Sequence, residues 1–273
     1  MTTYFSKVLR EHFPLIADAL NSRLECKEID TDNLWVRDAM PIKIGHGFVK
    51  FQYKRNTKYP QLEVDPSCWF WTNPRLSDIY LDGGNVVQDM NTVFMTEIVF
   101  KNNPKILRAD LEQFLNDIFG KRIIYLPVEP GDDLGHADGI IRIINGKTVL
   151  INDYSSIVSQ SWYEYSLKLE RILTESGFVV KKLPWIYPKR PKMSEEEFRK
   201  QFPFGDEWND GWGYYINAYR TEGFVFMPAF NISDDAKCRD YFSNYYHGNE
   251  IVPVDCSELS RCGGLLNCVV WED

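Results

Sequence analysis

Four short segments of the 273-residue chain hold residue types that can do chemistry together. They supply one thiol, one imidazole and three carboxylates, on Cys268, His136, Asp38, Asp82 and Asp138. A thiolate attacks electron-poor carbon, an imidazole moves protons, and paired carboxylates hold a planar cation. The combination therefore suits nucleophilic attack on a cationic amidine carbon.

The candidate nucleophile, Cys268, lies near the C-terminus in an apolar run that follows Gly263 and Gly264. Glycines let the backbone turn sharply or approach closely beside a site. We expect a strand over 266–271, which would carry Cys268. A cysteine in an apolar strand is usually a core residue, so this residue alone does not identify a catalytic site.

His136 and Asp138 form an H-x-D pair at the start of a predicted hairpin. Residues i and i+2 of a strand share a face, so we expect the imidazole and the carboxylate to point into the same space. Trp35, Arg37 and Asp38 form a second group. The structural alternatives are a hydrogen-bonded turn histidine and a buried tryptophan beside an Arg–Asp pair.

The four segments stand in the order typical of the agmatine deiminase and bacterial peptidylarginine deiminase family, and their patterns resemble that family's motifs. They are W-V-R-D at 35–38 followed by Pro41, L-D-G-G-N at 81–85, G-H-A-D at 135–138 and C-G-G-L-L-N-C at 262–268. The family belongs to the pentein superfamily of guanidino-group-modifying enzymes. The resemblance implies a cysteine-dependent hydrolase of guanidine C–N bonds that releases ammonia through a covalent thiouronium intermediate, with no metal and no organic cofactor.

The resemblance also implies residue roles. Cys268 would be the nucleophile, and His136 would be the general acid and base. Asp38 and Asp138 would clamp the guanidinium, because carboxylates pair with that group bidentately and fix its plane.

Further pocket residues follow from the same resemblance. Trp35 would form a wall, since an aromatic face suits a flat cation. Asp82 stands where many members have glutamate, and it would bind the guanidinium with a shorter reach. Asn217, in a segment that also resembles the family, would lie at the pocket rim or have a structural role. Asn267 replaces the family's histidine beside Cys268, which opens the question of substrate identity.

Alternative functions remain open at this point. The same covalent intermediate serves deiminases, dihydrolases and amidinotransferases. A catalytically weak relative that binds a cationic guanidino ligand is a different class of function. Asp82 and Asn267 motivate this alternative, because both differ from the family's usual residues. Turnover, as against a ligand-induced thermal shift without turnover, separates the two classes.

A unit of hairpin, helix and strand recurs along the chain, which predicts an α/β fold. The copies comprise hairpins at 85–99, 138–151 and 214–227, helices at 106–119, 162–176 and 233–245, and strands at 122–126, 178–183 and 250–254. The N-terminal part adds a helix over 4–24, a strand over 27–29 and a hairpin over 41–53, and the termini would complete one unit together. Such units must pack around a common axis. The resemblance implies a five-bladed α/β propeller in a single domain, 1–273; a generic sandwich is the alternative.

Two segments, 54–77 and 184–213, interrupt the repeats and are predicted to be irregular loops. The second is acidic and aromatic near its end, with Asp206, Glu207, Trp208, Asp210 and Trp212. We expect it to cover the pocket, with Trp212 contacting substrate, and to favour amine-tailed guanidines such as agmatine over free arginine. A packed surface loop is the alternative.

Composition limits the other function classes. The formal net charge is −8, so no broad basic surface for nucleic acid is expected. No run of about 18 apolar residues predicts a membrane span, and no signal peptide is apparent. The six cysteines are expected to be reduced in a cytoplasmic protein, and no metal-site spacing occurs. We expect a small cationic guanidino substrate as the partner, and homo-oligomerisation is left open.

Overall fold

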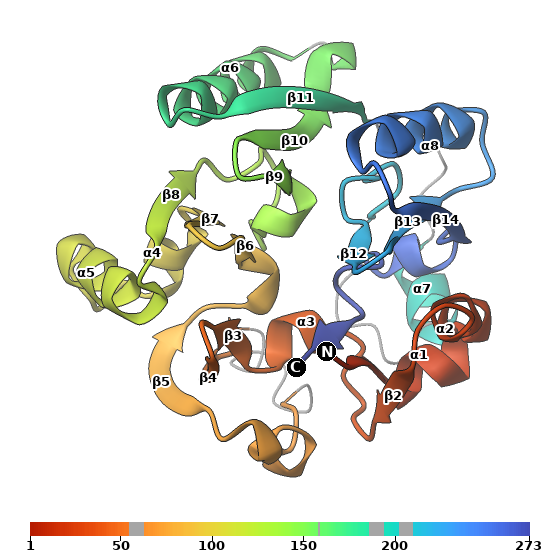
Figure 1. Cartoon of the computed structure of the whole chain (residues 1–273), viewed down its shortest axis with the longest axis horizontal. Helices are drawn as coiled ribbons and strands as arrows, with labels where there is room; N and C mark the ends of the chain where they lie inside the picture. Colours follow the sequence, from red (N-terminus) through yellow and green to blue (C-terminus); the bar gives the residue numbers. More distant parts are fainter. Residues whose placement is uncertain (55–62, 158, 186–193, 202–209) are drawn as a thin grey trace.

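Five three-stranded sheets lie around a central axis, and the two chain termini meet in one of them (Figure 1). The computed structural model describes residues 1–54, 63–157, 159–185, 194–201 and 210–273. In each sheet the middle strand is antiparallel to one neighbour and parallel to the other. This arrangement confirms the predicted α/β propeller.

Four sheets use strands that are consecutive in the chain. They are β3 (Ile42–Ile44), β4 (Gly47–Gln52) and β5 (Arg75–Tyr80); β6 (Val87–Gln88), β7 (Thr92–Thr96) and β8 (Arg122–Leu126); β9 (Ile141–Asn145), β10 (Thr148–Asp153) and β11 (Val179–Pro184); and β12 (Tyr219–Thr221), β13 (Phe224–Ala229) and β14 (Glu250–Asp255). The fifth joins β15 (Trp271–Glu272), β1 (Thr3–Ser6) and β2 (Cys26–Ile29). The termini therefore complete one unit together, as predicted.

Helices connect the middle strand to the third strand in four of the sheets. They are α4 (Ile98–Asn102) and α5 (Arg108–Phe119), α6 (Gln160–Glu175), α8 (Asp234–Tyr245), and α1 (Lys7–His12) with α2 (Pro14–Asn21). The hairpin, helix and strand unit predicted from the sequence is thus confirmed. Within the described ranges no helix is long and apolar enough to cross a membrane.

Short-range signals explain several element bounds. At the turn between β9 and β10, Asn145 Oδ1 accepts a hydrogen bond from the Lys147 amide at 3.0 Å, as expected for an Asn-Gly turn. Gly120 ends α5 with a φ of 59°, a conformation that costs glycine little. The hairpin predicted over 85–99 is too long, because β7 ends at Thr96 and α4 follows.

The helix predicted over 4–24 is wrong at both its start and its middle. Residues Thr3–Ser6 form β1, where β-branched and aromatic side chains suit a strand that pairs on both edges. Ser6 then caps α1 by accepting a hydrogen bond from the Leu9 amide. The helix stops before Pro14, which has no amide hydrogen and begins α2 instead.

The two predicted irregular loops contain regular elements. Strand β5 begins at Arg75 and pairs in parallel with β4. The short helix α7 (Glu195–Gln201) lies in the second segment. Three residues on which the lid prediction depends lie outside the described residues: Asp206, Glu207 and Trp208.

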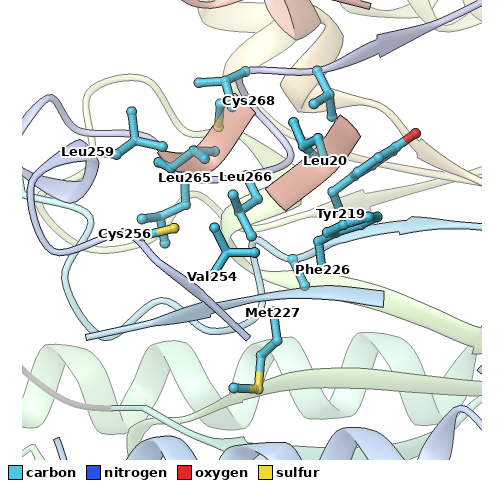
Figure 2. Packing of buried hydrophobic residues seen from close by; sticks show 14 of the residues in the cluster. Leu20, Tyr219, Phe226, Met227, Val254, Cys256, Leu259, Leu265, Leu266 and Cys268 are labelled. Carbon is cyan, nitrogen blue, oxygen red and sulfur yellow. The ribbon is translucent and has the colours of Figure 1, made fainter. Parts of the chain in front are cut away.

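The largest apolar cluster ties the C-terminal loop to the N-terminal helices and to β13 and β14. Figure 2 shows Leu20, Leu266 and Cys268 close together within this cluster, above Val254 and Met227. Burial of each large aliphatic side chain contributes about 1.5–3 kcal/mol relative to exposure. The backbone that carries Cys268 is therefore anchored in the core.

Candidate active site

The predicted site residues lie on turns between strands. Asp38 lies in the short helix α3 (Val36–Ala39), and Asp82 directly precedes a 3₁₀ turn. His136 precedes a second 3₁₀ turn, Ala137–Gly139, which contains Asp138. The prediction that His136 and Asp138 start a strand is wrong, because the Ile140 amide closes this turn on the Ala137 carbonyl before β9 begins.

Cys268 also lies on a loop. The strand predicted over 266–271 is wrong, since only Trp271–Glu272 pairs in a sheet. The Cys268 amide donates to the Leu265 carbonyl at 3.1 Å, and the Cys268 carbonyl accepts from the Arg37 amide at 3.2 Å. These backbone groups bond within the loop and to α3, so they cannot join a ladder. The loop fixes the cysteine beside the Asp38 segment.

Two carboxylates bracket the imidazole of His136. Its Nε2 lies 3.1 Å from Asp82 Oδ2, and its Nδ1 lies 3.5 Å from Asp38 Oδ1. Burial by itself lowers the pKa of His136, but the surrounding aspartates outweigh burial and raise the pKa to about 10. The aspartates therefore favour the imidazolium form of the ring, in which each nitrogen carries a proton.

Asp38 is held by backbone as well as by the ring. The Gly84 amide donates to Asp38 Oδ1 at 2.7 Å. Burial and repulsion from the neighbouring carboxylates raise the pKa of Asp38 to about 6, although the charge of His136 acts to lower it. A Cβ on Gly84 would lie 2.6 Å from Asp38 Oδ1 and 2.7 Å from His136 Nδ1. The second glycine of the L-D-G-G-N segment is thus required by close approach.

The Cys268 thiol faces two acceptors. Its Sγ lies 3.7 Å from Asp138 Oδ2 and 3.5 Å from Asn217 Oδ1. Burial and the negative charges of Asp138 and Asp38 raise its pKa well above the ordinary value. The free protein therefore holds a protonated thiol, and a bound cation would be needed to favour the thiolate.

Asn267 and Asn217 orient the Asp138 carboxylate and the cysteine loop. Asn267 Nδ2 donates to Asp138 Oδ2 at 2.7 Å, while the Asn267 amide donates to Asn217 Oδ1 at 3.1 Å. Asn217 Nδ2 donates to the Asp138 carbonyl at 3.3 Å. Sequence comparison singled out Asn267 as a departure from the family's motif; the structure gives it a carboxylate partner.

A cavity of about 160 Å³ brings most of the predicted residues together. Its lining includes Trp35, Asp38, His136, Asp138, Asn217 and Cys268. Asp82 lies behind His136, where its Oδ1 also accepts from the Lys54 amide at 2.9 Å. Trp212, a described residue, packs its ring on Phe230 with centroids 4.9 Å apart and lies outside the lining. Its contact with substrate stays a prediction.

Trp35 packs closely against the glycine run that precedes Cys268. A Cβ on Gly264 would lie 2.3 Å from the Trp35 ring, far closer than van der Waals contact. The glycine therefore permits the tryptophan to form one wall of the cavity beside the cysteine loop. This explains both the Trp35 and the Gly264 positions in the motif set.

We expect Gly264→Ala to displace the Trp35 ring or the cysteine loop. Overpacking of this kind costs about 1–3 kcal/mol of stability, and a shift of about 1 Å at reacting groups costs up to roughly 10²-fold in rate. Urea unfolding and kcat/KM for guanidine hydrolysis measure the two effects. Gly47→Ala is the control, because its Cβ would meet nothing within 4 Å. Equal losses in both variants would contradict the role assigned to Gly264.

The cavity also has an acidic section, of which the sequence analysis named only Asp210. Glu129, Asp132 and Asp210 all line it. The Tyr214 hydroxyl donates to Glu129 Oε1 at 2.8 Å, and burial raises the pKa of Glu129 to about 8 despite this bond. Residues 129–133 carry no motif beyond their acidity, so only the fold could place them beside Cys268.

Comparison with known proteins shows the family of the chain. The sequence model of the Porphyromonas-type peptidyl-arginine deiminase family matches residues 6–272. The chain belongs to this family. A Listeria monocytogenes protein named "Putative agmatine deiminase 1" is 25% identical over 291 residues, covering 93% of this chain and 78% of that protein.

Solved structures of this group share the fold. The agmatine deiminase of Enterococcus faecalis superposes with a TM-score of 0.80 at 17% identity, covering 100% of this chain and 92% of that one. The C. jejuni agmatine deiminase gives 0.77 at 20% identity, with 99% and 92% covered. DDAH from Pseudomonas aeruginosa gives 0.57 at 10% identity, with 98% and 97% covered. The family placement makes the chain a deiminase-type enzyme, a hydrolase of C–N bonds in linear amidines.

Proposed function

We propose that the chain hydrolyses the guanidino group of a small, amine-tailed cation, with agmatine as the first candidate. The observation that carries this proposal is the meeting of the Cys268 thiol, the His136 imidazolium and the Asp38 and Asp138 carboxylates at one buried cavity. Asp82 would position the imidazole of His136, because its carboxylate contacts the ring and lies outside the cavity lining.

Binding of the guanidinium would start the reaction. The cation pairs with Asp38 and Asp138 and cancels the negative charge that keeps the Cys268 thiol protonated. The Cys268 thiol then releases its proton to water, and the resulting thiolate attacks the guanidinium carbon and forms a C–S bond. Carboxylates on both sides of the cation fix its plane, which aligns the carbon with the sulfur.

His136 would move the protons of both half-reactions. As an imidazolium it gives a proton to the departing nitrogen, the C–N bond breaks, and ammonia leaves a thiouronium on Cys268. The neutral ring next takes a proton from water, and the resulting hydroxide attacks the same carbon. The C–S bond then breaks and the hydroxyl proton of the adduct is released to ammonia, which gives the ureido product and the thiolate, and the thiolate takes up a proton from water once the cation has left. The net change is guanidinium plus water to ureido product plus ammonium.

The cavity lining favours a substrate whose tail is not an anion. It contains Glu129, Asp132 and Asp210, and among its described residues there is no lysine or arginine. A distal ammonium would pair with the carboxylates of Asp132 and Asp210, whereas the α-carboxylate of free arginine would be repelled by them. The ligand class supported here is therefore a guanidine with a cationic or neutral tail.

A substrate screen tests the proposal directly. Agmatine, arginine, a peptidylarginine and a methylated arginine are each assayed for ammonia and for ureido product. We expect agmatine to give the highest kcat/KM. A thermal shift with agmatine and no product from any of the four would instead favour a ligand-binding relative without turnover.

The acidic section of the cavity predicts specificity. We expect the double change Asp132→Asn and Asp210→Asn to lower the agmatine-to-arginine ratio of kcat/KM by about tenfold, roughly 1.4 kcal/mol of differential transition-state binding. Asp133→Asn is the control, because Asp133 is exposed and does not line the cavity. An unchanged ratio in the double variant would mean that another segment selects the tail.

A further inference from the structure

A second and larger cavity, of about 670 Å³, lies on the central axis of the propeller. Every sheet contributes its inner strand to the wall: β3, β6, β9, β12 and β15 all take part. These strands surround the centre of the ring in Figure 1. The cavity shares no lining residue with the active-site cavity, so it is a separate space in the same fold.

The axial cavity is basic, although the chain as a whole carries a net charge of −8. Five cationic side chains line it: Arg37, Lys43, Lys121, Arg142 and Arg220. His46 lies in the same wall, and the carboxylates in the lining are those of Asp89 and Glu272. The concentration of cations is therefore a property of this site and not of the composition.

The cations are paired with neutral groups. Arg220 Nη1 donates to the Ile143 and Ile144 carbonyls at 3.4 and 3.3 Å. Lys121 Nζ donates to Gln88 Oε1 and to a backbone carbonyl, both at 2.7 Å. None of the five cations forms a direct ion pair with a carboxylate of the described residues. Hydrogen bonds to neutral groups thus hold these charges in place, and the carboxylates that act on them, such as Asp89 on Lys121, do so without a direct ion pair.

Arg142 and Arg37 show the same pattern deeper in the wall. Arg142 Nε donates to the Ile216 carbonyl at 2.9 Å, and burial lowers its pKa although the charge of Asp138 opposes this. Arg37 Nε donates to the Asn267 carbonyl at 3.2 Å. A guanidinium has five donors, so both retain further N–H groups.

The two carboxylates in the wall offset only part of this positive charge. Asp89 Oδ1 accepts from the Asn91 and Thr92 amides, both at 2.9 Å, and so closes its own turn. Glu272 Oε1 accepts from the Tyr219 hydroxyl at 2.7 Å. Both keep their negative charge, so five cationic side chains against two carboxylates leave an excess of positive charge in the lining.

We propose that this axial cavity is a binding site for a multivalent phosphate anion of a small phosphorylated metabolite. The donors approach from different sheets around the axis, and hence from several directions. A tetrahedral phosphate presents acceptors in all these directions, whereas a carboxylate accepts within one plane. The space is also large enough for more than one phosphate group.

The axial site lies next to the proposed catalytic residues without including them. Arg37 and Asn267 line it, and they directly precede Asp38 and Cys268 in the chain. The active-site cavity is acidic and should exclude phosphate. Binding of the anion is therefore expected to persist when the active site is filled, and this inference does not depend on the reaction proposed above.

Calorimetric titration with inorganic pyrophosphate, in buffer free of divalent cations, tests the site. We expect one pyrophosphate per chain, with an unchanged stoichiometry in saturating agmatine. The double change Lys43→Gln and Arg220→Gln removes two exposed cations of the wall and should raise the Kd by about tenfold or more, because bonds from charged donors are the strong ones. Both side chains lie at solvent-exposed positions, so folding should be preserved.

The matched control is Lys237→Gln with Arg239→Gln, which makes the same charge change at exposed positions of α8. We expect its Kd to equal that of the unmodified protein. The proposal is overturned if pyrophosphate at about 1 mM gives no binding, if the control pair weakens binding equally, or if agmatine displaces the anion.

Discussion

Cys268→Ala is expected to lower kcat for agmatine by at least about 10⁴-fold, because removal of a covalent nucleophile leaves only binding and electrostatic stabilisation. The free energy of unfolding should change little by comparison, since the thiol forms two weak polar contacts with Asp138 and Asn217. Single-turnover ammonia release and urea unfolding measure the two effects. Cys268→Ser tests the same point with the polar contacts retained.

The matched control is Cys262→Ala. Cys262 is a second thiol in the lining of the same cavity, and the mechanism gives it no step. Its variant should keep activity within a few-fold of the unmodified enzyme. A haloacetamidine, which resembles the cationic substrate, should label Cys268 in preference to Cys262. Full activity in Cys268→Ala, or equal labelling of both thiols, would contradict the assignment of the nucleophile.

Much of the fold could be predicted because its signals are local. The Asn145–Gly146 turn, the stop at Gly120 and the apolar spacing of α5 each follow from a few neighbouring residues. The strand β1 could not be read in this way. Its partners are β2 and the C-terminal β15, and pairing with a strand at the far end of the chain leaves no local mark.

The candidate site shows the same division between local and distant effects. The sequence motifs identified Cys268, His136 and Asp38 as candidates, and the fold brings these residues to one cavity. The local geometry was wrong where strands were expected, since tertiary hydrogen bonds from Arg37 hold the cysteine loop instead. The acidic section with Glu129 depends on burial, which sequence spacing does not report.

The role of Asp82 leads to the second large effect. The resemblance to known deiminases implied that this carboxylate binds the guanidinium, but its oxygens contact His136 Nε2 and the Lys54 amide. Asp82→Asn would keep the acceptor for the Lys54 amide and place a neutral group at the ring. Loss of one of the aspartates that raise the pKa of His136 to about 10 must lower that pKa, since burial opposes the charge.

We therefore expect Asp82→Asn to lower kcat by about 10²-fold, within the usual contribution of a positioned acid and base. The imidazolium donates a proton to the departing nitrogen, and the imidazolium form is lost as pH rises through the pKa of His136. The descending limb of kcat/KM should accordingly move to lower pH in the variant, because kcat/KM reports ionisations of the free enzyme.

Asp38→Asn separates this effect from loss of cation binding. It also exchanges a carboxylate beside His136 for an amide, but Asp38 lines the cavity. Removing one charge of a buried pair costs on the order of 3–5 kcal/mol, or about two to four powers of ten, so KM should rise by about that factor. In Asp82→Asn, KM should stay within a few-fold of its original value. A raised KM in Asp82→Asn with an unmoved pH limb would make Asp82 a substrate ligand after all, because only a group that touches the cation can change its affinity without changing the ionisation of the ring.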